Sequence, residues 1–168
     1  ETVMSEAKIL SRLTHPNIVR VFETNTFRKN DQQMFFITMG FIAGETLTQL
    51  LRRKIQLPIA EAVGIQRDLL AGLRLAHEQD PPIIHRDISP DNILISYDTG
   101  RPRALLSDFG LAQSFDQISS ISSAAGKYPY MAPECFWGAH LLASDVFSAG
   151  IVFYRMLTGM MPWEYDFE

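Results

Sequence analysis

The chain has 168 residues, 46% of them hydrophobic, which is enough to bury a core. Its formal net charge of −4 comes without a block of basic residues, which argues against nucleic acid as a partner. The longest apolar stretch, residues 146–157, contains Arg155 and is too short to cross a bilayer. A lone Cys135 cannot form an internal disulfide and fits a reducing compartment, so we expect a soluble cytoplasmic protein.

The first forty residues predict a helix and then two strands. Helical spacing of Val3, Glu6, Leu10 and Leu13 puts Glu6 inside an apolar stripe. That carboxylate either needs a partner or lies at the solvated edge of the stripe, and the spacing does not separate these alternatives. The helix should end at residues 15–17, because Pro16 pushes His15 out of the helical region. Strands are predicted at residues 18–22 and 34–39, with a polar turn at 28–33. No helix start signal precedes Val3, so we expect the chain to come from a longer one.

Residues 40–82 predict a linker and two helices. Gly40 and Gly44 mark the linker, and a short helix follows around three leucines, Leu47, Leu50 and Leu51. A long amphipathic helix is predicted after Pro58 and is stopped by residues 81–82, both proline. Its apolar face consists of Ala62, Ile65, Leu69, Leu73 and Ala76. Strands followed by helices, with a glycine-containing joint, predict an α+β chain with two unequal lobes.

The second half places polar residues at strand ends. Short strands are predicted at residues 93–96 and 104–106, joined by a turn with Gly100 at its tip. Asp87 and Asp108 should lie close together if these strands are neighbours. Residues 113–125 are serine-rich and too polar for a core. A last helix is predicted from Ser144, a good N-cap, to Gly159, and it is apolar on nearly every side, which indicates a buried central helix.

Three hard oxygen donors stand out in this half: Asp87, Asn92 and Asp108. Few carboxylates combined with a neutral amide suit magnesium, which also takes phosphate oxygens and water as ligands. Taken singly, Asp87 and Asn92 also fit residues that only fix the turns of a loop.

Three short motifs and one asparagine point to a family. The sequence HRD at residues 85–87 is followed by Asn92, then DFG at 108–110 and APE at 132–134. Their order and spacing resemble the eukaryotic-type (Hanks-type) Ser/Thr protein kinase catalytic domain, and the exchanged residues described below resemble its bacterial branch. The resemblance covers essentially the whole chain.

The resemblance implies a protein-kinase-like two-lobed fold that is incomplete. Residues 1–39 would form part of the small β-rich lobe, with helix C and strands 4 and 5, and residues 40–46 the hinge. Residues 47–168 would form the first half of the helical large lobe. This lobe would hold the catalytic loop at 85–92, the activation segment at 108–134 and helix F at 144–158. The glycine-rich loop and the lysine that pairs with Glu6 are not among these residues, so we expect the isolated chain to be inactive.

The resemblance also implies roles for single residues. Asp87 would orient the substrate hydroxyl and accept its proton, while Asn92 and Asp108 would hold Mg²⁺ against the phosphates of ATP. Arg86 would bind a phosphate on the activation segment, for which four serines are candidates: Ser119, Ser120, Ser122 and Ser123. The alternative is that these serines only form a solvated loop. The nucleotide would contact the helix-C glutamate, the gatekeeper, four residues of the hinge and one residue beyond it: Glu6, Met39, Gly40, Phe41, Ile42, Glu45 and Leu94.

Two further sets of residues have structural roles in the family. Leu10, Val21, His85 and Phe109 resemble the stacked regulatory spine, for which core packing is the role itself. Asp145 resembles the helix-F anchor of the catalytic loop. An acid in the first turn of a helix has a plainer explanation in the helix dipole, and the sequence leaves both open.

One pair of residues departs from the family pattern. Ser89 stands where most Ser/Thr kinases have a lysine that bonds the transferring phosphate, and Lys127 stands where they have a threonine. We hypothesise that Lys127 supplies the missing positive charge and Ser89 the missing hydroxyl, from opposite sides of the site. The alternative is an exposed Lys127 without a role.

We therefore expect an intact domain that transfers phosphate from ATP to serine or threonine of a protein substrate. The alternative is a pseudokinase or regulatory fragment that binds partner proteins without transferring phosphate. Retention of Asp87, Asn92 and Asp108 favours the first. The sequence predicts neither the substrate nor the oligomeric state.

Overall fold

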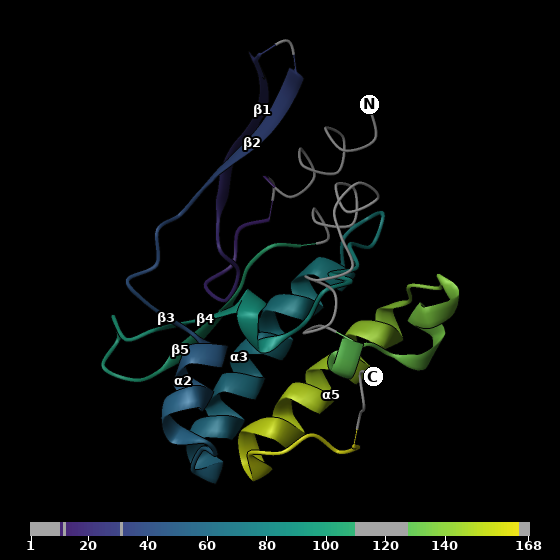
Figure 1. Ribbon diagram of the computed structural model, residues 1–168. Helices are drawn as coiled ribbons and strands as arrows, with labels where there is room; N and C mark the ends of the chain where they lie inside the picture. Colours follow the sequence, from purple (N-terminus) through teal and green to yellow (C-terminus); the bar gives the residue numbers. More distant parts are fainter. Residues whose placement is uncertain (1–10, 12, 31, 110–127, 165–168) are drawn as a thin grey trace.

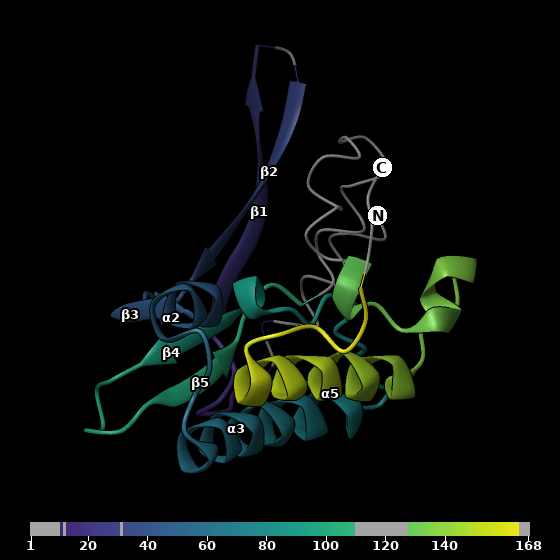
Figure 2. The same ribbon diagram turned by 60° about the horizontal axis from the view of Figure 1, so that its bottom comes forward.

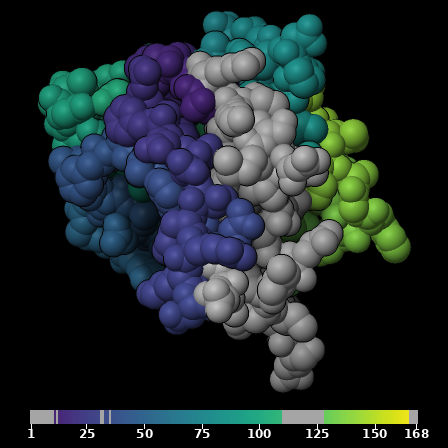
Figure 3. Space-filling view, turned by 90° about the horizontal axis from the view of Figure 1, so that it is seen from above, coloured from purple at the N-terminus to yellow at the C-terminus, as the bar shows by residue number. Residues whose placement is uncertain are grey.

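The computed structural model of the protein describes residues 11, 13–30, 32–109 and 128–164 (Figure 1). Several predicted site residues lie outside this part of the chain: Glu6, Leu10, Lys127 and the serines at 119, 120, 122 and 123. The described part comprises an antiparallel ribbon, a small sheet and a group of helices below it (Figure 1). In the view from above, the surface of the ribbon (purple to blue) lies well apart from that of residues near 135 (light green) (Figure 3).

The ribbon consists of β1 (Val21–Lys29) and β2 (Gln32–Met39), which pair antiparallel from Val21↔Met39 to Lys29↔Gln32. The predicted bounds of the first strand, residues 18–22, are wrong, as is the broad turn at 28–33. The polar run from Thr24 to Lys29 is strand, and Asn30 enters the tight turn with φ 50°. Both strands stand clear of the body (Figure 1), so polar residues face water along much of their length.

The apolar residues just before β1 pair with a different strand. Asn17 O accepts from Leu106 N at 2.9 Å, and Val19 N donates to Leu106 O at 2.8 Å, which makes a parallel bridge between Ile18 and Leu106. The Asn17 side chain adds a bond from Nδ2 to Ala104 O at 2.8 Å. These contacts fasten the base of the ribbon to the sheet of the large lobe.

That sheet has the order β3 (Gly44–Thr46), β4 (Ile93–Ser96) and β5 (Arg103–Leu106), and both pairings are antiparallel. The prediction that β4 and β5 are neighbours is confirmed by the register Ile93↔Leu106. β3 occupies the end of the segment expected to be hinge, so the connection between the lobes is irregular only over residues 40–43.

Three helices complete the large lobe: α2 (Leu47–Lys54), α3 (Ile59–His77) and α5 (Leu142–Thr158). α2 begins with a capping box, in which Thr46 Oγ1 accepts a hydrogen bond from Gln49 N and Gln49 Oε1 accepts one from Thr46 N. Figure 2 shows α3 and α5 side by side, and α3 also lies against β5. The predicted apolar face of α3 is confirmed, since all five of its residues are buried in the core: Ala62, Ile65, Leu69, Leu73 and Ala76.

α5 differs from its prediction at one end and on one face. It begins at Leu142, two residues before Ser144, because the Ser144 hydroxyl acts from inside the first turn, where it accepts from Leu141 N at 3.0 Å. Gly159 ends the helix in the left-handed conformation with φ 74°, as predicted. Within the described part of the chain, Val146 and Tyr154 remain 53% and 41% exposed, so the helix is not buried on every side.

Candidate active site

The catalytic loop is built around the amide of Asn92. Its Nδ2 donates to the carbonyl oxygen of Asp87 and to Asp87 Oδ2, both at 2.8 Å. Both partners are acceptors only, so the NH₂ group must face Asp87 and the amide oxygen Oδ1 must face away. A short 3₁₀ helix, Pro90–Asn92, brings the two residues together. Asn92 therefore fixes the orientation of the Asp87 carboxylate and keeps an oxygen for another partner.

Asp108 reaches the same place from the end of β5. Asn92 O accepts from Ser107 N at 3.0 Å and lies 3.1 Å from Ser107 Oγ, which is also 3.3 Å from Asp108 Oδ2. The hydroxyl has one proton, so it serves these two acceptors in turn or shares the proton between them. Asp108 is exposed and adopts φ 57°, a left-handed conformation that aspartate tolerates better than most residues. Asp87, Asn92 and Asp108 are thus joined by short contacts through Ser107.

His85 packs underneath this arrangement and is fully buried. Its Nδ1 accepts from Asp87 N at 3.3 Å, so the ring hydrogen is on Nε2, which lies 3.0 Å from Ser107 O and donates to it. Burial lowers the pKa of His85 below 6.5, against the opposing effect of nearby carboxylates, Asp145 first. A neutral His85 therefore ties the Asp87 segment to the Asp108 segment. Its ring also contacts Phe109, with 4.4 Å between centroids.

Asp145 anchors the loop from the first turn of α5. Its Oδ2 accepts from His85 N at 2.7 Å, and its Oδ1 accepts from Arg86 N at 2.9 Å. The anchoring role is therefore confirmed. Arg86 has φ 67°, a strained conformation for a residue with a side chain, and such strain persists only where the surroundings fix it.

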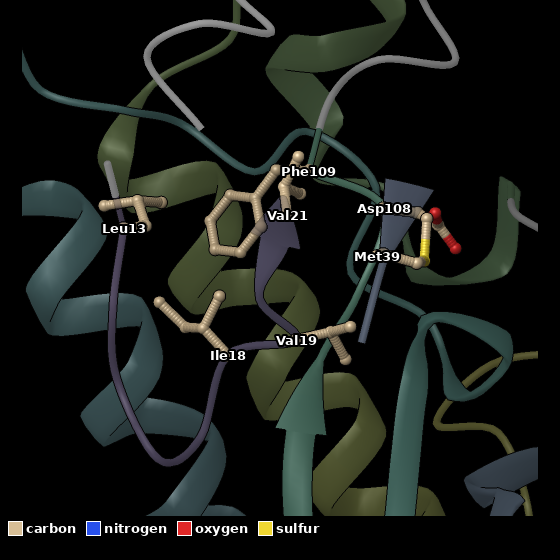
Figure 4. A pocket seen from close by; sticks show the side chains of 7 residues that line it. All are labelled: Leu13, Ile18, Val19, Val21, Met39, Asp108 and Phe109. Carbon is tan, nitrogen blue, oxygen red and sulfur yellow. The ribbon is translucent and has the colours of Figure 1, made fainter. Parts of the chain in front are cut away.

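A small hollow lies between the ribbon and Asp108 (Figure 4). Figure 4 shows Phe109 directed toward Leu13 and Ile18, with Met39 beside the Asp108 carboxylate. The full lining is Leu13, Ile18, Val19, Val21, Met39, Asp108 and Phe109. Three of the four predicted spine residues, Val21, His85 and Phe109, therefore lie together, and the fourth is outside the described residues.

The segment expected to meet the nucleotide base runs from Gly40 to Ile42. Gly40 N donates to Arg20 O at 2.8 Å and is not available to a ligand. Within the described chain, the backbone groups of Phe41 and Ile42 form no hydrogen bond, and the Phe41 side chain is 92% exposed. The backbone of residues 41 and 42 is thus open to a partner.

Glu45 lies apart from Leu94, another of the predicted nucleotide contacts. It pairs with Ile95 while Thr46 pairs with Leu94, so Glu45 and Leu94 point to opposite faces of the sheet. Its Oε1 accepts from Arg53 Nη2 at 2.5 Å and from the Tyr97 hydroxyl at 2.6 Å. Strand alternation thus separates the side chain of Glu45 from that of Leu94, and a contact between Glu45 and the nucleotide stays a prediction.

On the other side of Asp87, a second hollow is lined by the catalytic loop, residues 130–131 and the start of α5. Arg86, Asp87, Tyr130 and Met131 line it together with Cys135, which is partly exposed. Two residues after Asp87, Ser89 is only 1% exposed, and its hydroxyl has no hydrogen-bond partner among the described residues. A buried unpaired hydroxyl is unfavourable, and native structures contain few of them.

The donor set fits the magnesium ion that the family implies. Among the described residues, no three His, Cys, Asp or Glu side chains are grouped closely enough to hold a metal. Magnesium in phosphoryl-transfer sites instead takes one or two protein oxygens and completes its coordination with phosphate and water. The exposed Asp108 carboxylate and the amide oxygen of Asn92, which faces away from Asp87, are oxygens of this kind.

The sequence reasoning missed two residues that shape the site. Ser107 links Asn92 to Asp108 through its hydroxyl, and His77 contacts the anchor Asp145 at 2.8 Å. Ser107 directly precedes the DFG motif at residues 108–110, and this position could have marked it as a candidate. His77 ends an amphipathic helix, and nothing in the local pattern distinguishes it from a surface histidine.

None of the described helices is long and apolar enough to cross a bilayer.

Comparisons with known proteins agree with this geometry. The chain is 34% identical over 164 residues to a probable serine/threonine-protein kinase of Clostridium perfringens, covering 96% of this chain and 23% of the relative. It is 33% identical to the serine/threonine-protein kinase pkn3 of Myxococcus xanthus, covering 96% and 30%. A crystal structure of Rad53 1-466 in complex with AMP-PNP matches with a TM-score of 0.75 and 28% identity, covering 98% of this chain and 39% of that one.

The chain thus spans about a quarter of the length of these two curated relatives. The model of one family, the protein kinase domain, matches residues 1–167. The motifs that the structure joins at Asn92 and Ser107 lie within that match. This chain belongs to the protein kinase domain family.

Proposed function

We propose that the protein containing this chain transfers the γ-phosphoryl group of ATP to a serine or threonine hydroxyl of a protein substrate. The observation that carries the proposal is the double hydrogen bond from Asn92 Nδ2 to Asp87, beside the contact between Ser107 and Asp108. The relatives named as Ser/Thr kinases and the nucleotide analogue bound to Rad53 support it.

In this reaction the acceptor oxygen forms a bond to the γ-phosphorus while the bond from that phosphorus to the leaving ADP oxygen breaks. Asp87 orients the acceptor hydroxyl and takes its proton, and Asn92 keeps the Asp87 carboxylate in place for this task. Asp108 and the amide oxygen of Asn92 would hold magnesium, which supplies charge neutralisation for the phosphates when bound. Positioning and electrostatics therefore account for most of the rate enhancement expected from these residues.

We propose that Ser89 and Lys127 act as a pair in this site. The buried Ser89 hydroxyl has no partner within the described part of the chain, which supports the idea, because such a group gains most from a donor or acceptor brought to it. A lysine ammonium is a donor of suitable charge for both a hydroxyl and a phosphate. Lys127→Ala should reduce kcat much more than it raises KM for the acceptor, and Lys29→Ala in the ribbon is the control. An unchanged kcat would refute the pair.

The test of the proposed function uses the full-length protein, ATP, magnesium and a mixture of candidate protein acceptors. Phosphate should appear on serine or threonine by mass spectrometry, and Asp87→Asn should abolish the transfer. Asp98→Asn changes an exposed acid at the far end of the sheet and should have no effect. Tight ATP binding without transfer to any acceptor would favour the alternative, a regulatory pseudokinase.

A further inference from the structure

Arg155 is a cation in an otherwise apolar part of α5. Two neighbours on the helix, Val152 and Met156, are fully buried in the core, while Arg155 itself is partly buried. Its Nη1 donates to the hydroxyl oxygen of Tyr130, and its guanidinium carbon lies 5.9 Å from the centroid of the Tyr130 ring. The end of the arginine side chain is therefore held by a tyrosine.

The tyrosine does not balance the charge of Arg155. Within the part of the chain that the structure describes, no aspartate or glutamate forms an ion pair with this guanidinium. A phenol hydroxyl supplies an oxygen but no negative charge, and it takes up only one of the five N–H donors of an arginine. A partly buried cation is stabilised by an anion beside it. The remaining donors are thus suited to a carboxylate or a phosphate from a partner molecule.

The face of α5 that carries Arg155 also borders the hollow beside Asp87. Ser148 lines that hollow together with Tyr130. Arg155 follows Ser148 by seven residues, which is close to two helical turns, so both side chains lie on one face of the helix. Tyr130 contributes to the hollow and also contacts the guanidinium. Arg155 is thus separated from the hollow by one side chain.

A protein substrate bound at Asp87 can reach Arg155. In the proposed reaction the acceptor hydroxyl must lie beside the Asp87 carboxylate. Two helical turns correspond to about 11 Å, a distance that an extended peptide covers in roughly three residues. A side chain at roughly two to four positions from the acceptor is therefore able to meet the guanidinium.

We propose that Arg155 determines substrate specificity by binding an acidic side chain of the protein substrate close to the acceptor; this rests on the function proposed above. The anion is the carboxylate of an aspartate or glutamate, and the phosphate of a phosphoserine offers the same chemistry. A lysine or arginine at the same position of the substrate is repelled. The contact lies away from the reacting atoms and is made before and during the reaction, so it acts on KM more than on kcat.

Pools of synthetic peptides around a central serine test the proposal with the full-length protein, ATP and magnesium. In each pool one position near the serine is fixed as aspartate, phosphoserine, alanine or arginine, and the others vary. At the position that meets Arg155, the wild type should phosphorylate the aspartate pool with a kcat/KM about tenfold or more above that of the alanine pool. The preference should shrink in about 1 M salt, because salt screens a partly exposed charge pair.

Three variants separate Arg155 from other cations. Arg155→Met removes the charge and keeps a long side chain, and it should reduce the preference for aspartate to less than about twofold. Arg155→Glu should reverse the preference, so that the arginine pool is favoured over the aspartate pool. Arg74→Glu is the matched control, because it changes the net charge equally on α3, where Arg74 is 77% exposed and makes only a surface pair with Glu78. This control should keep the wild-type preference.

A binding measurement does not depend on phosphate transfer. Fluorescently labelled pools with alanine in place of the central serine are titrated with each protein, and the anisotropy is followed. The wild type and Arg74→Glu should bind the aspartate pool more tightly than the arginine pool. Arg155→Glu should show the opposite order.

Other outcomes would overturn the proposal. A wild type that phosphorylates and binds the acidic, neutral and basic pools equally has no acid-binding position near the acceptor. A folded Arg155→Glu or Arg155→Met protein with the wild-type preference would show that Arg155 does not bind the substrate, even if its thermal stability is lower. If the wild type transfers phosphate to no pool, the proposed function fails, while the anisotropy still decides whether Arg155 selects acidic peptides.

Discussion

Substituting Gly44 by alanine should loosen the sheet that carries the catalytic loop. A methyl group at Gly44 would overlap the carbonyl oxygen of Ile95 and lie 2.9 Å from its carbonyl carbon. Both are backbone atoms of the neighbouring strand and cannot turn aside as a side chain can. The Gly44↔Ser96 end of the β3–β4 pairing must therefore open. Gly64 on α3 is the matched control, because a methyl group there meets nothing within 4 Å.

The size of the effect follows from these contacts. Opening one end of the ladder removes one or two backbone hydrogen bonds at about 1 kcal/mol each, and the steric shift costs about 1–3 kcal/mol more. Gly44→Ala should thus destabilise the sheet by about 2–5 kcal/mol. Gly64→Ala should instead stabilise α3 by up to about 1 kcal/mol, because alanine favours a helix interior.

Amide hydrogen exchange in the full-length protein measures both effects locally. Peptides that cover residues 44–47 and 93–96 should exchange roughly 30-fold faster or more in Gly44→Ala, since about 1.4 kcal/mol corresponds to a factor of ten. Gly64→Ala should leave these peptides unchanged. Wild-type exchange in Gly44→Ala would refute the reasoning, because the strands would then have absorbed the methyl group without separating.

Three further predictions concern the site. Asn92→Leu removes both bonds to Asp87 and should raise the magnesium concentration for half-maximal phosphate transfer, measured by titration, at least about tenfold. Burial lowers the pKa of His85 in the folded protein. As the pH falls below 6.5, His85 therefore takes up a proton in the unfolded chain before it does so in the folded protein. This difference lowers the free energy of unfolding in acid. Unfolding at pH 7.5 and 5.5 should therefore show a smaller acid-induced loss for His85→Phe than for wild type, by up to about 1.4 kcal/mol per pH unit. The Ser144 hydroxyl donates to Glu134 Oε1 at 2.6 Å, and this hydrogen bond is the main cause that lowers the pKa of Glu134. Ser144→Ala should therefore raise the pKa of Glu134 toward its ordinary value in a carboxyl NMR titration. An unchanged pKa would be inconsistent with this cause.

Local patterns predicted the helices of the large lobe better than the strands of the small one. The face of α3 follows from apolar spacing, because a helix of that length can bury only one stripe. The bounds of β1 were misjudged because the apolar residues 18–19 pair with β5, far away in the sequence. A short apolar run indicates that it will be buried but does not say against which partner.

The candidate site shows the same division. The grouping of Asp87, Asn92 and Asp108 followed from two adjacent strands whose ends must meet, and a family resemblance supplied their roles. The face of Glu45 depended on a register that the sequence does not contain, and the contact of His77 depended on how α3 lies against α5. The surroundings of Glu45 and His77 depend on contacts between segments far apart in the sequence. Such contacts cannot be predicted from the neighbouring residues in the chain.

The attachment of the β1–β2 ribbon has a mechanical consequence. Its two ends are joined to each other by the hydrogen bond from Gly40 N to Arg20 O. Next to this bond, residues 17–19 form backbone hydrogen bonds with Leu106 of β5. The ribbon is therefore attached to the rest of the molecule only at its base, beside the Asp108 segment, as far as the described residues show. A rigid-body rotation of the ribbon that keeps these bonds must pivot at this base. The turn at its tip would then move far, while Val21 and Met39 would stay close to Phe109.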